Sequence, residues 1–334
     1  AGLPPEMRVL EEKEATHLLT GAMDQAIDEE TTLRLMALSD RLGQRDDRTG
    51  RYYYEKTIRA IVGEARSNDI ALDSLPAMGA ASWEEMQALL PPPATEDLDV
   101  QLLEAITTGL QLMPKQPPTK TSQDYRDFLG KMQRQLSGGL LWTDWLKLSK
   151  DEPAKAEIPC TDDVRLVASR LEEHPKFHAD LKDYLGQLFG IASQVGDRYR
   201  ALKRERGVVD FQDLEKETLD LLRNSVESRE ILSEEIDLLV VDEFQDTSPI
   251  QLALFSELGQ CAKRVVWVGD VKQSIYEFRG ADPELIRAAV SGAQKEAPLA
   301  TSWRSLPDLV TLANSLFAKP FLDRISLPES ETVI

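Results

Sequence analysis

Residues 236–247 read Ile236-Asp-Leu-Leu-Val-Val-Asp242-Glu243-Phe-Gln-Asp-Thr247, and this stretch decides the fold expected for the chain. Its apolar run is too short for a helix and is typical of a strand buried on both faces of a parallel sheet. Ligands of open α/β sheets bind outside the carboxyl ends of strands, which is where two carboxylates follow here. We therefore expect Asp242 to hold Mg²⁺ through water and Glu243 to polarise a water for attack on a phosphoryl group. Taken alone, the pair also fits a strand that simply ends in solvated acids.

Two further pieces follow in order. The apolar run Val265-Val-Trp-Val268 precedes the polar loop Gly269-Asp-Val-Lys-Gln273-Ser-Ile-Tyr276-Glu-Phe278-Arg279, and a later piece reads Leu299-Ala-Thr-Ser-Trp-Arg304-Ser305. Between them, Asp282-Pro283 predicts a helix start, with an N-cap followed by proline at the first helical position. In this order and spacing the three pieces resemble motifs II, III and IV of superfamily 1 DNA helicases, the UvrD/Rep/PcrA/RecB group. The second piece is most similar to the RecB/AddA branch.

The resemblance implies ATP and Mg²⁺ as cofactors and gives four residues a role in hydrolysis. It implies Mg²⁺ binding by Asp242, general-base action by Glu243, γ-phosphate or water sensing by Gln273, and a γ-phosphate contact from a second lobe by Arg304. The amide of Gln273 can donate to a phosphate and accept from a water at once. The guanidinium of Arg304 can bind two phosphate oxygens, or can form a salt bridge across a domain junction.

The same resemblance implies DNA contacts from the loop that carries Gln273. Tyr276 and Phe278 match the aromatic positions of motif III, whose side chains stack on single-stranded bases, and Arg279 adds positive charge beside them. The alternative for Phe278 is packing under the next helix. Motif IV usually reads Asn-Tyr-Arg-Ser, whereas this chain has Ser302-Trp-Arg304-Ser. Arg304 keeps its assigned role despite this departure. Whether Ser302 can take the role of the family's asparagine is open.

The composition limits other interpretations. The 334 residues carry a net charge of −19, which averages over faces and leaves room for the locally basic segment 198–206, either a phosphate-binding groove or a solvated helix face. The two cysteines, Cys160 and Cys261, predict free thiols in a reducing, cytoplasmic setting. Pro175 lies between His174 and His178, which predicts a helix start there and not a pair of metal ligands. No apolar run approaches the roughly 18 residues that span a membrane.

Three regions are expected along the chain. Residues 1–205 are predicted to be an all-helical inserted domain, with the clearest helix over 176–205 and with Trp142 and Trp145 on one core-facing helix surface. Residues 206–294 are expected to form the C-terminal part of a first RecA-like lobe, and residues 295–334 the start of a second. The fold class is thus α/β, a partial RecA-like parallel-sheet lobe of the P-loop NTPase type. Gly207–Leu214 is similar to the Asp-Phe-x-Asp-Leu segment that precedes motif II, and Asp210 is expected to cap a helix there.

The phosphate-binding pattern Gly-x-x-x-x-Gly-Lys-Ser/Thr does not occur in these 334 residues. In the family it lies before the segment that this chain resembles. We therefore expect a segment of an ATP-dependent 3′–5′ DNA helicase from a RecB/AddA-like helicase–nuclease in double-strand break repair, inactive when isolated. The implied partners are single-stranded and duplex DNA and a subunit of the AddB or RecC kind. The alternative is a non-catalytic helicase-like module that binds DNA or a partner subunit.

Overall fold

The computed structural model describes residues 7–116, 118–270 and 303–325. The chain divides into two compact units, Gly2–Leu214, here called the helical unit, and Glu215–Ile334, here called the sheet unit. The described part is mostly helical and contains two small parallel sheets. No helix among the described residues is both long and apolar enough to cross a membrane.

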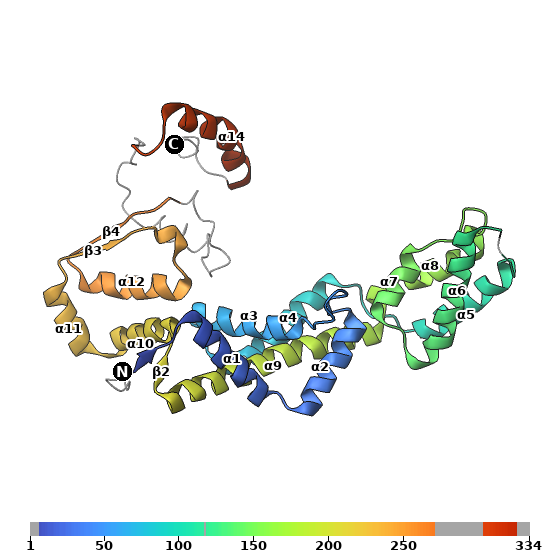
Figure 1. Ribbon diagram of the computed structural model, residues 1–334, viewed down its shortest axis with the longest axis horizontal. Coiled ribbons are helices and arrows are strands. Elements are labelled where there is room, and N and C mark those ends of the chain that lie inside the picture. The colour runs from blue at the N-terminus through green and yellow to red at the C-terminus, as the bar shows by residue number, and fades with distance from the viewer. Residues whose placement is uncertain (1–6, 117, 271–302, 326–334) are drawn as a thin grey trace. The chain divides into compact units, whose positions relative to one another are not determined.

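The helical unit consists of helices and one short pair of strands (Figure 1). Its elements are β1 (Arg8–Val9), α1 (Glu12–Ala26), α2 (Glu29–Leu42), α3 (Tyr54–Ser67), α4 (Leu75–Leu89), α5 (Leu98–Leu112), α6 (Lys120–Gln135), α7 (Trp142–Lys150), α8 (Asp162–Ala168), α9 (Pro175–Arg206) and β2 (Val208–Val209).

Helix α9 is the long axis of this unit, and α1, α3 and α4 pack along it. It begins where the sequence predicted, because Pro175 occupies the first turn and the Nδ1 atom of His174 accepts a hydrogen bond from the backbone N–H of Lys176 at 3.1 Å. It ends at Gly207, whose φ of 63° suits a residue without a Cβ. The interpretation of His174 and His178 as a helix start is therefore confirmed.

The hydrophobic pattern did not predict α4, whose buried residues Leu75, Gly79 and Trp83 lie four positions apart with a glycine at the centre. A Cβ added to Gly79 would lie 2.8 Å from the Cβ of Phe189 on α9, so the two helices approach too closely for any larger residue. Gly196 of α9 is in similarly close contact with Leu72. Glycine is thus required here by packing and not by backbone conformation.

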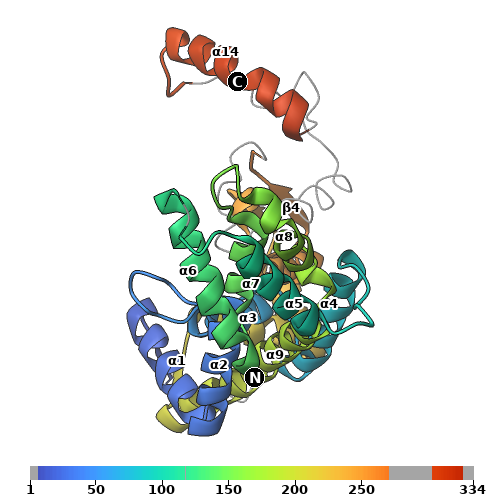
Figure 2. The ribbon, with the colours of Figure 1, turned by 90° about the vertical axis from the view of Figure 1, so that its right-hand side faces the viewer.

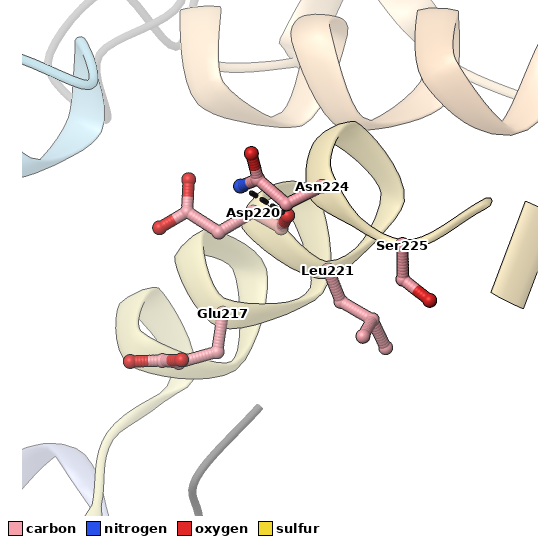
Figure 3. A pocket seen from close by; sticks show the side chains of 5 residues that line it. All are labelled: Glu217, Asp220, Leu221, Asn224 and Ser225. Carbon is pink, nitrogen blue, oxygen red and sulfur yellow. Dashed lines mark hydrogen bonds between the residues drawn. The ribbon is translucent and has the colours of Figure 1, made fainter. Parts of the chain in front are cut away.

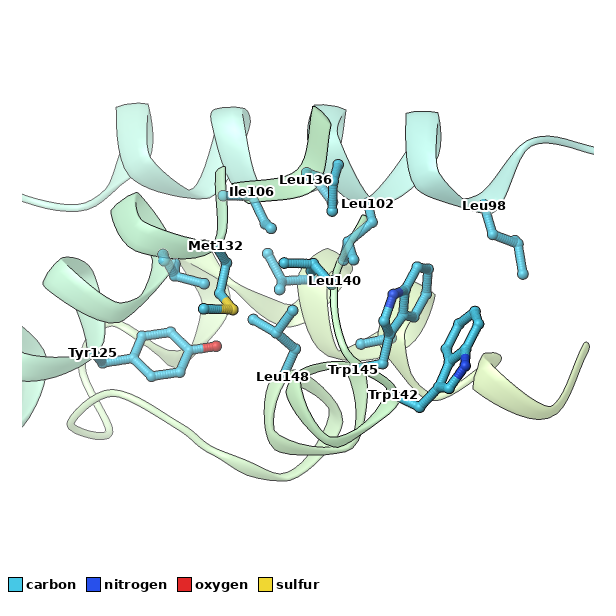
Figure 4. Packing of buried hydrophobic residues seen from close by; sticks show 14 of the residues in the cluster. Leu98, Leu102, Ile106, Tyr125, Met132, Leu136, Leu140, Trp142, Trp145 and Leu148 are labelled. Atoms are coloured by element: carbon cyan, nitrogen blue, oxygen red, sulfur yellow. The ribbon is translucent and has the colours of Figure 1, made fainter. Parts of the chain in front are cut away.

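Three hydrophobic clusters lie among the described residues of the helical unit. The first joins α1, α2, α3, the Leu72–Leu75 turn and α9, and the second is formed by α5, α6, α7 and α8, which Figure 2 shows grouped together. The third joins α1, the end of α9 and β2. Trp142 and Trp145 both point into the second cluster (Figure 4), which confirms the core role predicted for them. Tyr54 of α3 is a buried member of the first cluster, so this tyrosine packs in the core of the helical unit.

The strand pair at the end of α9 differs from the expectation. Residues 206–210 were expected to open the sheet lobe, but Val208–Val209 pairs in parallel with Arg8–Val9 at the start of the helical unit. The pairing, together with the ion pairs described below, joins this segment to the helical unit, so the unit extends to Leu214 and not to 205.

The sheet unit contains most of α10 (Phe211–Asn224), which begins in the helical unit, then α11 (Val226–Glu235), β3 (Leu238–Val241), α12 (Pro249–Cys261), β4 (Arg264–Trp267) and α14 (Pro307–Ile325). Strands β3 and β4 are parallel, and their register pairs Leu238 with Arg264 and Val241 with Trp267. Helix α12 connects them and packs against β3. The predicted helix start at Asp282-Pro283 lies outside the described residues.

The prediction that this strand is buried on both faces is wrong for β3. Leu239 and Val241 pack against Phe244, Phe255 and Trp267 on the side of α12. Leu238 and Val240 point to the other side and are 52% and 54% exposed. The physical reason is that successive residues of a strand face opposite ways, and only one face of β3 is covered by described residues.

Candidate functional site

The site lies where β3 ends. Asp242 follows the last residue of β3 directly, and both it and Glu243 are exposed. The backbone N–H of Glu243 donates to Asp242 Oδ1 at 2.9 Å. Glu243 has a φ of 51°, in the left-handed region where a residue with a side chain is strained. This turn lifts both carboxylates out of the sheet, as expected for acids that meet a ligand at a strand end.

The residues after the strained turn hold it in place. The 3₁₀ turn Phe244–Asp246 buries the Phe244 ring, which packs edge-on against Trp267 of β4 at 6.3 Å between ring centroids. Helix α12 then starts with a capping box, in which Ser248 and Gln251 each satisfy a backbone N–H of the other. The surrounding packing therefore fixes the backbone of the two acids.

The end of β4 lies beside the end of β3. The N–H of Val268 donates to the carbonyl of Val241 at 2.8 Å, and the N–H of Phe244 donates to the carbonyl of Val268 at 3.1 Å. Gln245 contacts the next residues of this segment, because its Oε1 atom accepts a hydrogen bond from the Asp270 N–H at 2.9 Å. The structure thus brings the beginning of the second sequence piece, Gly269-Asp270, next to the Asp242-Glu243 pair.

Not all expected site residues can be placed. Gln273, Tyr276, Phe278 and Arg279 lie outside the described residues. Arg304 is described and exposed, and no hydrogen bond or ion pair joins it to Asp242 or Glu243 in the part of the chain that the structure describes. Convergence of Asp242, Glu243, Gln273 and Arg304 on one cleft therefore stays a prediction.

The acids at the strand end fit a magnesium ion that is carried in with a nucleotide. Within residues 7–116, 118–270 and 303–325, no group of three or more His, Cys, Asp or Glu side chains could hold a metal ion. Mg²⁺ differs from most metals in that it keeps several waters and often takes only one or two carboxylates, with phosphate oxygens from the substrate. The exposed carboxylate of Asp242 suits that coordination. Its Oδ1 atom accepts a hydrogen bond from the Glu243 N–H, which orients the carboxylate.

A shallow pocket elsewhere in the sheet unit does not belong to this site (Figure 3). It is lined by Glu217, Asp220, Leu221 and Asn224 of α10 and by Ser225, the N-cap of α11. Its carboxylates make the lining acidic, and Lys216 is already paired with Asp220 at 2.7 Å. Such a surface repels phosphate groups, so it is a poor place for a nucleotide or for DNA.

A second polar cluster, inside the helical unit, was not expected. Asp210 caps α10 as predicted, since its Oδ1 atom accepts from the N–H of Asp213 at 3.0 Å. Beyond capping, Asp210 is buried against Arg66, Tyr199 and Lys203. Burial alone would raise the pKa of Asp210, but the hydrogen bonds and charges of Arg66 and Lys203 hold that pKa well below its ordinary value.

Lys203 shows the opposite balance in the same cluster. Burial and the neighbouring charge of Arg66 lower the pKa of its ammonium group, against the pull of Asp210 and Asp213. The cluster ties α3, α9 and the start of α10 together. Sequence alone showed only a basic segment and a capping aspartate, because the partners are far apart along the chain.

Sequence reasoning did not single out Gln245, which contacts Glu243 at this site. It is 1% exposed, and its Nε2–H group donates to Glu243 Oε2 at 2.6 Å. The available signal was a polar amide two residues after a proposed base, at the edge of a buried strand. Such an amide must find hydrogen-bond partners when it is buried.

Comparison with known proteins places this site in a family context. Residues 190–293 match the UvrD/REP helicase N-terminal domain. The chain is 34% identical over 198 residues to the A subunit of the ATP-dependent helicase/nuclease of Bacillus velezensis, covering 50% of this chain and 16% of that protein. Proteins of the same name from Levilactobacillus brevis and Carboxydothermus hydrogenoformans are 30% identical over 191 residues and 32% identical over 148 residues. These two alignments cover 54% and 44% of this chain, and 15% and 12% of the relatives.

Proposed function

Residues 190–293 belong to the UvrD/REP helicase N-terminal domain family, as part of a UvrD/RecB-like superfamily 1 chain, and from this premise we propose that the chain is a segment of an ATP-dependent DNA helicase. The observation that carries the proposal is the pair Asp242 and Glu243 at the carboxyl end of β3, with the end of the parallel strand β4 beside it. This is the edge at which open parallel sheets bind nucleotides.

In the proposed reaction each residue has one task. Asp242 binds the Mg²⁺ that accompanies ATP, and this ion neutralises phosphate charge. Glu243 accepts the proton of the attacking water. Gln273 contacts the γ-phosphate or that water, and Arg304 reaches the γ-phosphate from a second lobe. The support for the assignments of Gln273 and Arg304 is their place in the sequence motifs. For Gln273 there is also the hydrogen-bonded link from Glu243 through Gln245 to the backbone of Asp270.

The wider proposal concerns the parent protein. The two parallel strands with α12 between them are consistent with a RecA-like lobe, and the helical unit with an insertion into it. We propose 3′–5′ movement along single-stranded DNA within a helicase–nuclease for double-strand break repair, in which Tyr276, Phe278 and Arg279 contact DNA. An AddB- or RecC-like subunit, duplex DNA and a cytoplasmic setting complete the proposal, the last supported by the free Cys160 and Cys261.

The test uses the full-length helicase that contains this segment. Glu243→Gln should lower the DNA-stimulated ATP hydrolysis rate by about 100-fold or more, since a positioned general base contributes about 10²–10⁴-fold. Binding of a fluorescent ATP analogue should persist because Asp242 remains. The matched control is Glu235→Gln, an exposed glutamate on α11, which should leave hydrolysis unchanged.

Two outcomes would contradict the proposal. Unchanged hydrolysis in the Glu243→Gln protein would remove Glu243 from the reaction. DNA binding without any hydrolysis in the wild-type protein would favour the non-catalytic module instead. The isolated 334-residue chain should show no DNA-stimulated hydrolysis, because it lacks the phosphate-binding pattern. Steady hydrolysis that disappears on Glu243→Gln would overturn that expectation.

A further inference from the structure

Gln245 joins the two strand ends at the candidate site through both ends of one buried amide. Its Nε2–H group donates to Glu243 Oε2 at 2.6 Å, and its Oε1 atom accepts from the backbone N–H of Asp270 at 2.9 Å. Glu243 follows β3, and Asp270 follows β4. One side chain therefore links the proposed base to the backbone three residues before Gln273 in the sequence.

The orientation of this amide is determined by its partners. A carboxylate can only accept and a backbone N–H can only donate, so exchanging the amide oxygen and nitrogen would break both hydrogen bonds at once. Close packing adds a second constraint. A Cβ added to Gly269 would lie 2.4 Å from Gln245 Oε1 and 2.4 Å from the Phe244 ring, so the backbone of β4's end rests directly on this amide.

Glu243 itself is the solvent-exposed member of the arrangement. Its side chain is exposed and sits on a left-handed turn, and a free glutamate there would sample several rotamers. A general base works only when its oxygen lies within hydrogen-bond reach of the proton it accepts. The short hydrogen bond from the buried Gln245 amide favours one of these rotamers, and so one position of the Glu243 carboxylate.

We propose that Gln245 is a positioning residue for Glu243, which holds its carboxylate in the orientation used for hydrolysis and ties that orientation to the backbone at Asp270. This inference rests on the proposed function, in which Glu243 is the base. Gln245 does not touch ATP in the proposal. It acts through Glu243, and its effect should vanish when Glu243 can no longer act as a base.

Three variants of the full-length helicase separate this role from a structural one. Gln245→Met keeps the length of the side chain and removes both hydrogen bonds. Gln245→Glu keeps an acceptor for the Asp270 N–H but puts an oxygen against Glu243. The control is Gln133→Met on α6, because the half-buried amide of Gln133 also donates a side-chain hydrogen bond, to Thr107 Oγ1 at 2.8 Å, within the helical unit.

We expect both Gln245 variants to lower kcat for DNA-stimulated ATP hydrolysis by about 10- to 100-fold, the usual effect of losing a residue that orients a catalytic group. KM for ATP should change by less than about threefold, because the nucleotide contacts remain. Gln133→Met should leave kcat unchanged, even where its melting temperature falls as far as that of Gln245→Met.

A double-mutant cycle gives the decisive readout. In a Glu243→Gln background, measured by single-turnover hydrolysis, adding Gln245→Met should change the rate by less than about threefold, since residues that act as one unit are strongly non-additive. An equal loss in both backgrounds, or a loss of kcat matched by Gln133→Met, would overturn the positioning role. If the wild-type protein hydrolyses no ATP, or if Glu243→Gln has no effect, the proposed function itself is wrong, whatever the Gln245 variants show.

Discussion

Arg66 Nη2 donates to Asp210 Oδ1 at 2.5 Å, although the two residues are 144 positions apart in the chain. Arg66 lies on α3, and Asp210 precedes α10. Tyr199 and Lys203 of α9 reach the second oxygen of the same carboxylate, at 2.7 Å and 3.1 Å. One aspartate therefore fixes the start of α10 against two helices of the helical unit.

Replacing Asp210 with asparagine should destabilise the helical unit strongly. The amide retains the shape and the helix cap, but it leaves the buried charges of Arg66 and Lys203 without this partner. Removing one member of a buried ion cluster costs about 3–5 kcal/mol, and the remaining Asp213 should keep the loss near the lower end. Urea unfolding of this chain, followed by circular dichroism, measures the change.

The control for Asp210→Asn is Asp220→Asn on the same helix. Asp220 forms an exposed pair with Lys216, and such pairs contribute about 0–1 kcal/mol. Equal losses of unfolding free energy in the two variants would mean that the Asp210 cluster contributes no more than a surface pair.

Asp99 should make the helical unit sensitive to acid. Hydrogen bonds from His174 and then from Lys176 lower the pKa of Asp99 to about 2, while burial opposes them. A carboxyl group whose pKa is lower in the folded chain stabilises it above the unfolded pKa of about 4, and this contribution is lost as the pH falls from about 4 toward 2. Its size is on the order of 1–2 kcal/mol.

Asp99→Asn should therefore flatten the fall of unfolding free energy between about pH 4 and pH 2, which denaturant titrations at several pH values measure. Glu104→Gln, at an exposed position on the same helix, should keep the wild-type slope. A slope for Asp99→Asn equal to that of the wild type would show that the contact with His174 contributes nothing to stability.

Trp145 should be the most costly residue to truncate in the core of α5–α8. Its side chain is fully buried, lies edge-on to the His174 ring with centroids 5.0 Å apart, and lies beside Trp142 in the cluster of Figure 4. Trp145→Ala should cost about 3–5 kcal/mol of unfolding free energy, because the cavity cannot be refilled. Leu166→Ala, at a position 66% exposed, should cost less than about 0.5 kcal/mol. Similar losses would place Trp145 outside the core.

Phe278→Ala in the full-length helicase should weaken binding to single-stranded DNA by roughly tenfold or more, since stacking of a base on an aromatic ring contributes about 1–3 kcal/mol. ATP hydrolysis at saturating DNA should fall less, so that hydrolysis becomes uncoupled from unwinding. If Phe278 instead packs in a core, DNA affinity should stay unchanged while the melting temperature drops, because a lost buried ring costs about 3–5 kcal/mol. Both quantities should be measured on the same variant.

The local elements of this chain could be predicted because local patterns encode them. The run before Asp242 gave a strand that ends where the carboxylates begin. His174-Pro175 marked the start of α9. Propensity, capping and hydrophobic period all act within a few residues, so they can be read from a single sequence.

Contacts between distant segments were decided only by the tertiary structure. The exposed face of β3 depends on which elements cover the sheet, and the limit of the helical unit at Leu214 depends on strand pairing between Val208–Val209 and Arg8–Val9. The link from Gln245 to Asp270 spans 25 positions, and that from Arg66 to Asp210 spans 144. A buried polar group must find partners, but its sequence neighbourhood does not show which distant group the fold will bring to it.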